Sequence, residues 1–134
     1  MPNTVPGRLH DVVYAAMRLV AGGLFACDGV QKLFGVLGAH GRAPTPLLLA
    51  AGAIELGGGA MIAAGLAARY AAFVASGEMA VAYFMAHAPR SFWPAVNKGE
   101  LAVLYCFVFL YIASRGSGIL SADGAIRRLS ARLQ

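Results

Sequence analysis

Four long apolar segments constrain this sequence more than any other feature. They cover residues 11–33, 47–68, 69–88 and 97–114. Each has roughly the length of about 20 residues that a helix needs to cross the hydrocarbon core of a bilayer. The segments are continuously apolar rather than alternating, which favours helices over the strands of a β-barrel. The sequence therefore predicts an all-α fold, a polytopic four-helix transmembrane bundle.

Glycine and proline, the strongest breaks in a helical pattern, separate these segments. They mark a long first loop (Gly35, Gly38, Gly41, Pro44 and Pro46), a tight turn (Gly65) and a second loop over residues 89–94. The chain is 59% hydrophobic and 13% charged, against roughly 25% charged in soluble domains. A small soluble protein cannot bury so much apolar surface. We expect a single membrane domain over residues 1–134, with a polar tail from residue 115 to residue 134.

The distribution of basic residues predicts the orientation. Four crossings place both termini on one side of the membrane. That side then holds six arginines: Arg8, Arg69, Arg115, Arg127, Arg128 and Arg132. The other side holds Lys32, Arg42, Arg90 and Lys98. Cytoplasmic termini follow from the positive-inside rule, and the net charge of +5 is explained by this topology and by anionic lipid, with no nucleic acid as partner.

Two ionisable residues lie deep inside the predicted helices. Arg18 and Glu78 are at similar depth when residues are counted inward from the cytoplasmic helix ends at about 1.5 Å each. A charged side chain at the centre of a bilayer costs about 2.5–3.5 kcal/mol on insertion scales and is expected to have a partner. We therefore predict a structural ion pair between Arg18 and Glu78.

A second polar set lies toward the outer helix ends, where a pocket opening outward is expected. It consists of Asp28, Lys32, Glu55, His87, Asn97 and Glu100. Asp28 and Lys32, four residues apart, have the spacing of an ion pair on one helix, and a Lys32–Glu100 clamp is an alternative. Glu55 shares a helix face with Gly52 and Gly59, and such glycines let another backbone approach closely.

The remaining chemistry-bearing residues give no metal site. Cys27 and Cys106 form no CxxC pair and are interpreted as structural, although a redox pair is an alternative. No His/Cys set has the spacing of a metal site. A haem held by His40 and His87 is a further alternative, disfavoured because His40 lies in a loop.

Taken in order, the residues form a recognisable series: Phe25, Asp28-Gly29, Lys32-Leu33, Gly52, Glu55, Gly65, Arg69, Met79, Ala82, Asn97, Gly99-Glu100, Gly116-Ser117-Gly118, Ser121 and Asp123. This series resembles the DoxX family of small bacterial four-helix membrane proteins over some four fifths of the chain. Asp28 departs from the pattern, in which an apolar or aromatic residue precedes the Gly-x-x-Lys unit. The resemblance implies a subunit in the bacterial cytoplasmic (inner) membrane, similar to the membrane part of a thiosulfate:quinone oxidoreductase.

On that resemblance, the expected function is a quinone-interacting subunit of a sulfur- or thiol-linked redox system. Lys32, Glu55 and Glu100 are then the expected catalytic residues, and Asp28, His87 and Asn97 are expected to contact the quinone head group. Since no motif for a flavin, haem or iron–sulfur cluster is present, electrons require a soluble redox protein, another membrane subunit or a direct thiol or sulfur substrate. Whether the chain itself is an enzyme stays open.

The alternative is a non-catalytic membrane anchor or scaffold for a soluble redox or stress-response partner. Residues 116–123 and the basic tail would then dock that partner, or the tail would lie on the anionic inner leaflet. Assembly with further copies of the chain is also compatible with the sequence. A small transporter is disfavoured, because helices 1–2 and 3–4 show no clear inverted repeat.

Overall fold

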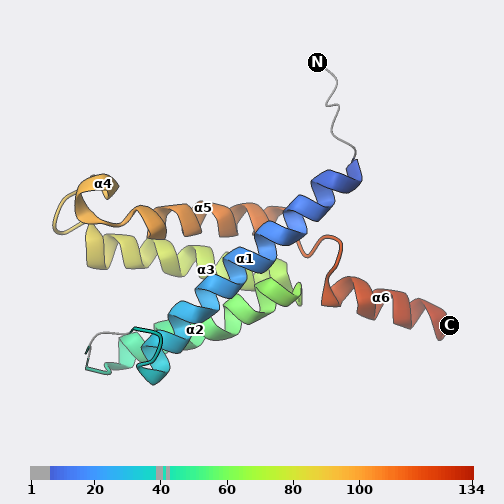
Figure 1. Ribbon diagram of the computed structural model, residues 1–134, viewed down its shortest axis with the longest axis horizontal. Helices are drawn as coiled ribbons and strands as arrows, with labels where there is room; N and C mark the ends of the chain where they lie inside the picture. Colours follow the sequence, from blue (N-terminus) through green and yellow to red (C-terminus); the bar gives the residue numbers. More distant parts are fainter. Residues whose placement is uncertain (1–6, 39–40, 42) are drawn as a thin grey trace, which may run out of the picture.

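The computed structural model describes residues 7–38, 41 and 43–134, and every regular element in these residues is a helix (Figure 1). This confirms the all-α class. His40 and Arg42 lie outside the described residues. The elements in chain order are α1 (Gly7–Phe34), α2 (Pro46–Ala64), α3 (Ala68–Ala82), the π-helical turn η1 (Tyr83–His87), α4 (Pro94–Asn97), α5 (Glu100–Arg115) and α6 (Ala122–Arg132).

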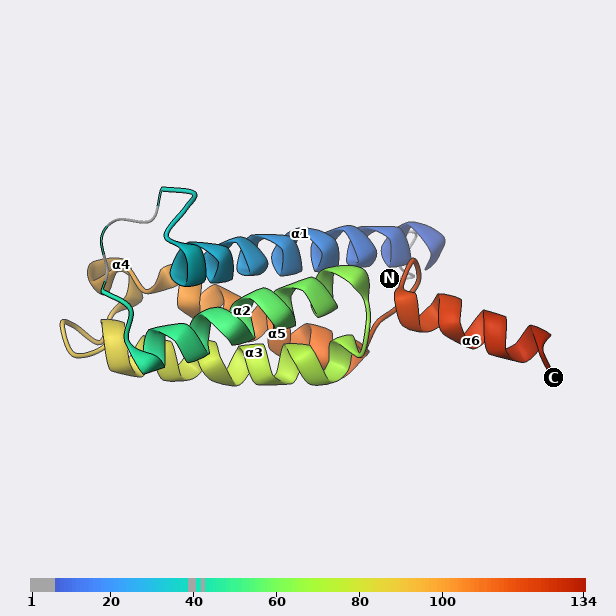
Figure 2. The same cartoon turned by 90° about the horizontal axis from the view of Figure 1, so that it is seen from below.

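Four of these helices form the body of the molecule, which comprises α1, α2, α3 with η1, and α5. Helix α1 packs on α2, α2 on α3, and α3 on α5, whereas α1 and α5 touch more sparsely. Figure 1 shows α1 crossing α3 and α5 obliquely. Figures 1 and 2 show α4 at one end of the body and α6 projecting beyond the other end. The two ends of the body therefore present different chain segments, and each has its own polar cluster.

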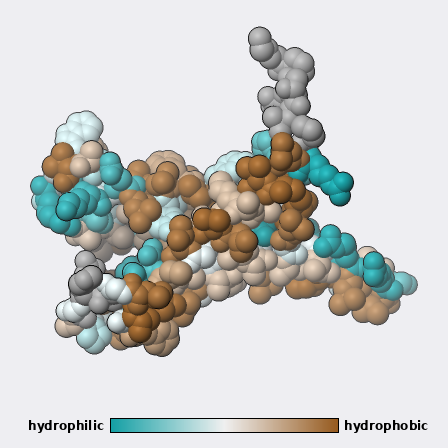
Figure 3. Space-filling model, in the orientation of Figure 1, coloured by the Kyte–Doolittle hydropathy of each residue, from teal (hydrophilic) through white to brown (hydrophobic). Residues whose placement is uncertain are grey.

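The interior of the body is small and partly aromatic. Phe25, Ile62, Phe109 and Ile112 are fully buried. The Phe25 and Phe109 rings lie 4.7 Å apart between centroids, and Tyr105 stacks on Phe109 at 5.2 Å. Large apolar side chains such as Phe73, Leu104 and Phe107 instead point outward and are exposed. Figure 3 shows apolar residues gathered over the middle of the body and hydrophilic ones at its α4 end.

Glycines bring α1 and α2 into direct backbone contact. An added Cβ at Gly22 would lie 2.5 Å from the amide nitrogen of Ala63, and one at Gly59 would lie 2.5 Å from that of Ala26. Gly29 is equally tight, with the Gly52 carbonyl oxygen 2.7 Å from such a Cβ. Close approach of two backbones through small residues is typical of helix pairs in membranes, and it confirms the interpretation of Gly59 as a packing position.

Local backbone conformation moves the ends of the helices away from the predicted limits. Helix α2 begins after Thr45, whose hydroxyl accepts from the Leu48 amide at 3.1 Å. It ends at Ala64 rather than residue 68, because Gly65 takes a left-handed conformation (φ 70°) that closes the turn to α3. At the other loop, Lys98 (φ 60°) separates the single turn of α4 from α5, so the last long helix starts at Glu100 and not at residue 97.

Two of the described helices, α1 and α2, are individually long and apolar enough to cross a membrane, whereas the sequence predicts four. Helix α5 has 16 residues, and α3 has 15 before the chain continues into the five residues of η1. The predicted polar tail contains α6, in which no residue is buried.

Candidate functional site

An ion pair between α1 and α2 forms the centre of one polar site. The Lys32 ammonium donates to Oε1 of Glu55. The Glu55 side chain is 1% exposed, whereas that of Lys32 is 27% exposed. The pair therefore reaches from the surface into the interior of the body, with the lysine at the accessible side.

Three carboxylate oxygens near this pair are buried without any hydrogen-bond partner among the described residues: Oε2 of Glu55 and both oxygens of Glu78. Glu78 interacts electrostatically with Glu55 and Lys32, and Asp28 lies one helical turn before Lys32. We call Asp28, Lys32, Glu55 and Glu78 the carboxylate cluster. It holds three carboxyl groups and one ammonium, an excess of acceptors in a poorly solvated place.

The carboxylate cluster is spread out rather than convergent. Within the described ranges, no three His, Cys, Asp or Glu side chains lie close enough together to hold a metal ion. The arrangement can instead accept hydrogen bonds or protons from a polar group placed between the carboxyl groups. Unlike metal binding, accepting hydrogen bonds or protons does not require the carboxyl groups to converge on one atom.

The structure selects among the alternatives for Lys32. Its ammonium pairs with Glu55, and neither the Asp28–Lys32 pair nor the Lys32–Glu100 clamp is among the salt bridges of the described residues. Glu100 is exposed in the first turn of α5. Of the three residues predicted to be catalytic, the structure brings Lys32 and Glu55 into contact. Glu100 contacts neither of them through a salt bridge.

His87 and Asn97 lie together in the structure that closes the α4 end of the body. The Asn97 amide donates to the Ser91 carbonyl at 2.7 Å and to the Tyr83 hydroxyl at 3.1 Å, and its oxygen accepts from the Gly99 amide at 2.7 Å. His87 Nδ1 lies 3.2 Å from the Asn97 carbonyl oxygen. These bonds use both amide hydrogens of Asn97 and one acceptor site of its oxygen, so the residue holds the second loop in shape.

The predicted ion pair between Arg18 and Glu78 is wrong. The buried Arg18 guanidinium donates to the carbonyl oxygens of Ser117, Ile119 and Leu120, in the segment between α5 and α6. Glu78 has no hydrogen-bond partner. The depth estimate failed because α1 begins at Gly7, before the predicted residue 11, and extends past the end of the body, so Arg18 lies level with the turn after α2.

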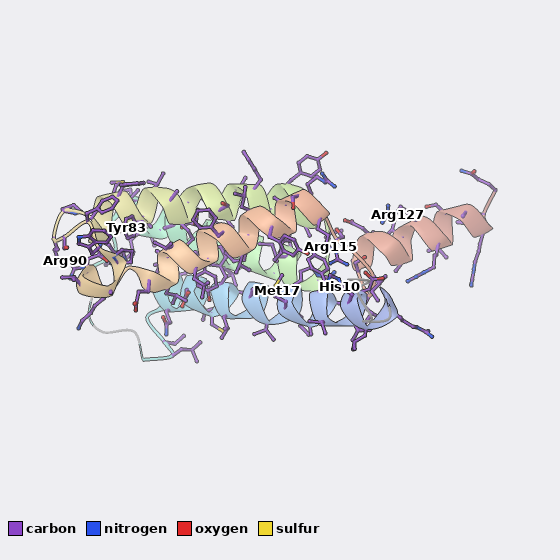
Figure 4. All side chains as sticks on the ribbon, turned by 90° about the horizontal axis from the view of Figure 1, so that it is seen from above. His10, Met17, Tyr83, Arg90, Arg115 and Arg127 are labelled. Atoms are coloured by element: carbon purple, nitrogen blue, oxygen red, sulfur yellow. The ribbon has the colours of Figure 1, made fainter. Side chains whose placement is uncertain are left out.

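Further polar contacts surround Arg18 at this end of the body. Arg115 donates to Asp11 at 2.6 Å, and its guanidinium carbon lies 4.2 Å from the centre of the Tyr14 ring. The Tyr14 hydroxyl donates to the Gly116 carbonyl at 2.6 Å. Figure 4 shows Arg115 beside His10 where α5 ends. The Asp11–Arg115 pair was not predicted from the sequence. Nothing in either segment indicates that the start of α1 lies beside the end of α5.

Asp123 fastens the start of α6 to the turn between α2 and α3. Its Oδ2 accepts from the Ser117 hydroxyl at 2.5 Å and from the Ala67 amide at 2.9 Å. These two hydrogen bonds, that of Ser117 first, hold the pKa of the Asp123 carboxyl below its ordinary value. The signal in the sequence was the series Gly116-Ser117-Gly118, Ser121 and Asp123. This segment was given a docking role under the anchor alternative and no role within the fold.

We predict that this attachment weakens in acid. Since the pKa of Asp123 is lowered in the folded state, its stabilising effect is complete above the unfolded value of about 3.9 and is lost as the pH falls through the folded pKa. The difference in melting temperature between the wild type and Asp123→Asn should be constant above that range and should narrow below it. The Ala67 amide resonance should follow the same titration, and Ser117→Ala should move its midpoint upward; an unchanged midpoint would contradict the assignment.

The two cysteines do not form a disulfide. Cys27 is exposed on α1, and Cys106 is half-buried on α5 with its sulfur 3.5 Å from the Ser76 hydroxyl oxygen. The Ser76 hydroxyl also donates to the Cys106 carbonyl at 2.8 Å, a contact that ties α3 to α5. The geometry agrees with a packing position for Cys106.

Comparisons with known proteins give a consistent result. The DoxX family model matches residues 13–88, which is more than half of the chain and extends from α1 to the end of η1. A relative from Haemophilus influenzae, described as an uncharacterized protein, is 39% identical over 116 residues, covering 81% of this chain and 87% of the relative. No solved structure matches the chain significantly.

Proposed function

This chain belongs to the DoxX family of membrane proteins, and from that premise we propose that it crosses the bacterial cytoplasmic membrane four times as a helical bundle with cytoplasmic termini. Helices α1 and α2 are each long and apolar enough to cross a membrane. Helix α3 continues into η1, so that residues 68–87 form one uninterrupted helical run. Helix α5 is shorter than the bilayer core, a mismatch that local thinning accommodates. The exposed apolar side chains over the body support lipid contact (Figure 3).

The proposed activity is the binding of a membrane quinone by the carboxylate cluster, within a sulfur- or thiol-linked redox system. One observation carries the proposal: oxygens of Glu55 and Glu78 are buried with no hydrogen-bond partner among the described residues. Buried polar atoms are almost always hydrogen-bonded. A quinone carbonyl can accept from the Lys32 ammonium, and the hydroxyls of the reduced form, quinol, can donate to the carboxylates.

The residues have distinct roles in this proposal. Lys32, whose side chain is partly exposed, donates a hydrogen bond to a head-group oxygen. Glu78 and the second oxygen of Glu55 accept protons or hydrogen bonds on the interior side. A bound quinone supplies the redox chemistry, and the chain's residues bind it, orient it and hold the protons. Electrons come from a soluble redox protein, another membrane subunit or a thiol or sulfur compound.

Glu78→Gln tests the site, because it removes a carboxylate that has no structural partner. We expect purified Glu78→Gln protein to retain about one tenth of the quinone that the wild type retains, since loss of a hydrogen bond to a charged group costs roughly 1.5–3 kcal/mol. Glu100→Gln is the matched control, because Glu100 is exposed and outside the carboxylate cluster. Quinone extracted from both preparations would be measured by chromatography, together with quinone reduction by thiol and sulfur donors.

Equal quinone content in Glu78→Gln and wild-type protein would contradict the proposed site. The melting temperatures of Glu78→Gln and Glu100→Gln distinguish a folding defect from a binding defect, because only a folding defect lowers the melting temperature of Glu78→Gln below that of the control. Lys32→Met combined with Glu55→Gln provides a second probe, because the double change removes the ion pair without leaving one charge buried alone.

A membrane anchor for a soluble partner is the second candidate. Helix α6 favours it, because it projects beyond the body (Figure 2). Its apolar side chains Ile126 and Leu129, and Leu133 just after its end, are exposed. Absence of bound quinone, absence of turnover and co-purification of a soluble redox enzyme would support the anchor over the quinone subunit.

A further inference from the structure

A cavity of about 430 Å³ lies between the start of α6 and the end of the body. Its walls come from three separate parts of the chain: the first turn of α3, the end of α5 with the segment that follows it, and the first half of α6. The volume falls in the range of about 300–1,000 Å³ found for small-molecule sites. The carboxylate cluster does not contribute to it, so the cavity is a separate feature.

Three arginines line the cavity, one from each wall: Arg69, Arg115 and Arg127. Arg115 is held in place by Asp11 and by the Tyr14 ring. Arg69 and Arg127 have no side-chain hydrogen bond or salt bridge among the described residues. Two guanidinium groups therefore have unused donors toward the same space. Figure 4 shows Arg115 and Arg127 on the two sides of the junction between α5 and α6.

The one acidic residue among the described residues of the cavity wall offsets only part of this positive charge. Asp123 lines the cavity, but its Oδ2 already accepts from Ser117 and from the Ala67 amide. The lining thus carries three guanidinium groups against one carboxylate. Guanidinium groups bind phosphate oxygens in a planar, bidentate geometry that no other side chain matches.

We propose that this cavity binds a phosphate ester through Arg69 and Arg127, with Arg115 fixed as the third positive charge. Ser117 and the glycines on either side of it form the part of the wall between α5 and α6, where the Ser117 hydroxyl donates to Asp123. The site is a binding site for an anion and takes no part in the redox chemistry proposed for the carboxylate cluster.

The position of the cavity points to the head group of an anionic phospholipid as one source of this phosphate. Arg69 and Arg115 stand at helix ends of the body, where the proposed orientation places the cytoplasmic lipid head groups. Tyr70, which also lines the cavity, is 74% exposed, and tyrosine is enriched at membrane interfaces. A soluble phosphate ester has the same chemistry and is the second source.

Adjacent arginines on α6 allow a matched test. Arg127 lines the cavity, whereas Arg128 does not, and the two replacements Arg127→Gln and Arg128→Gln remove the same charge from the same helix. Phosphatidylglycerol retained by the detergent-purified protein would be counted by native mass spectrometry, with phosphatidylcholine as the zwitterionic comparison. Binding of glycerol phosphate would be measured by calorimetry.

We expect Arg127→Gln to weaken binding at least about tenfold, as loss of a charge-assisted hydrogen bond implies, and Arg128→Gln to leave it unchanged. Arg69→Gln should match Arg127→Gln. Equal effects of the two α6 variants, or no binding of either compound, would overturn the proposal. The lipid measurement rests on the proposed membrane orientation and the glycerol phosphate measurement does not, so binding of glycerol phosphate alone would support the cavity and identify a soluble ligand.

Discussion

Alanine at Gly22, Gly29 or Gly59 is expected to destabilise the protein by about 3 kcal/mol or more, the upper end of the range for overpacking. A methyl group at Gly22 or Gly59 would stand 2.5 Å from a backbone nitrogen of the facing helix. Because the obstacle is main chain, no side-chain rotation relieves it, and α1 must move away from α2. A domain with about 5–15 kcal/mol of total stability loses a large share of it.

Neighbouring glycines on the same two helices provide the controls. An added Cβ at Gly23 or Gly57 meets nothing within 4 Å, so alanine there should be neutral or should stabilise the helix by up to about 1 kcal/mol. Unfolding in mixed detergent micelles, followed by circular dichroism, would measure both sets. Equal stability of Gly22→Ala and Gly23→Ala would show that the helices do not meet through these glycines.

Replacement of Arg18 by methionine is the second change with a large expected effect. Methionine roughly preserves the volume but leaves the carbonyl oxygens of Ser117, Ile119 and Leu120 without their donor. Hydrogen bonds to charged groups contribute roughly 1.5–3 kcal/mol each, and the lower cost of burying a neutral side chain offsets part of the loss. We expect a decrease of about 3 kcal/mol in the free energy of unfolding.

A double-mutant cycle with Glu78→Gln distinguishes the observed contacts of Arg18 from the ion pair inferred from the sequence. Residues without shared partners have additive effects, whereas paired residues do not. The structure predicts additivity for Arg18→Met with Glu78→Gln, measured by the same unfolding experiment. Arg8→Met, at an exposed position on the same helix, should have little effect.

The all-α class follows from the sequence because it depends on two properties of each segment by itself. These are the length of the apolar run and the absence of polar–apolar alternation. The ends of the helices were harder to predict. The left-handed conformations of Gly65 and Lys98 are set by how the chain turns, and apolar runs continue across such turns without a break. The separation of α4 from α5 illustrates this, since Asn97 lies in a single-turn helix and not at the start of a long one.

The candidate site was predicted only in part, for a related reason. Helical spacing places Lys32 and Glu55 each on an inward face, but their pairing depends on how α1 slides along α2, and the glycine contacts determine that register. The partners of Arg18 were not foreseeable from hydropathy, because they are carbonyl oxygens of a loop. Any residue type supplies such oxygens, so they leave no signal in the sequence.

The contact between α1 and the segment after α5 also bears on how the protein is made. Arg18 is synthesised early, yet the carbonyl oxygen of Leu120 that it binds follows it by 102 residues in the chain. During translation, the first helix therefore carries a charged side chain without these carbonyl partners until residue 120 has left the ribosome. Chains that stop after α5 would lack the carbonyl oxygens that bind this arginine, so we expect their first helix to be held less firmly than in chains that extend past Leu120.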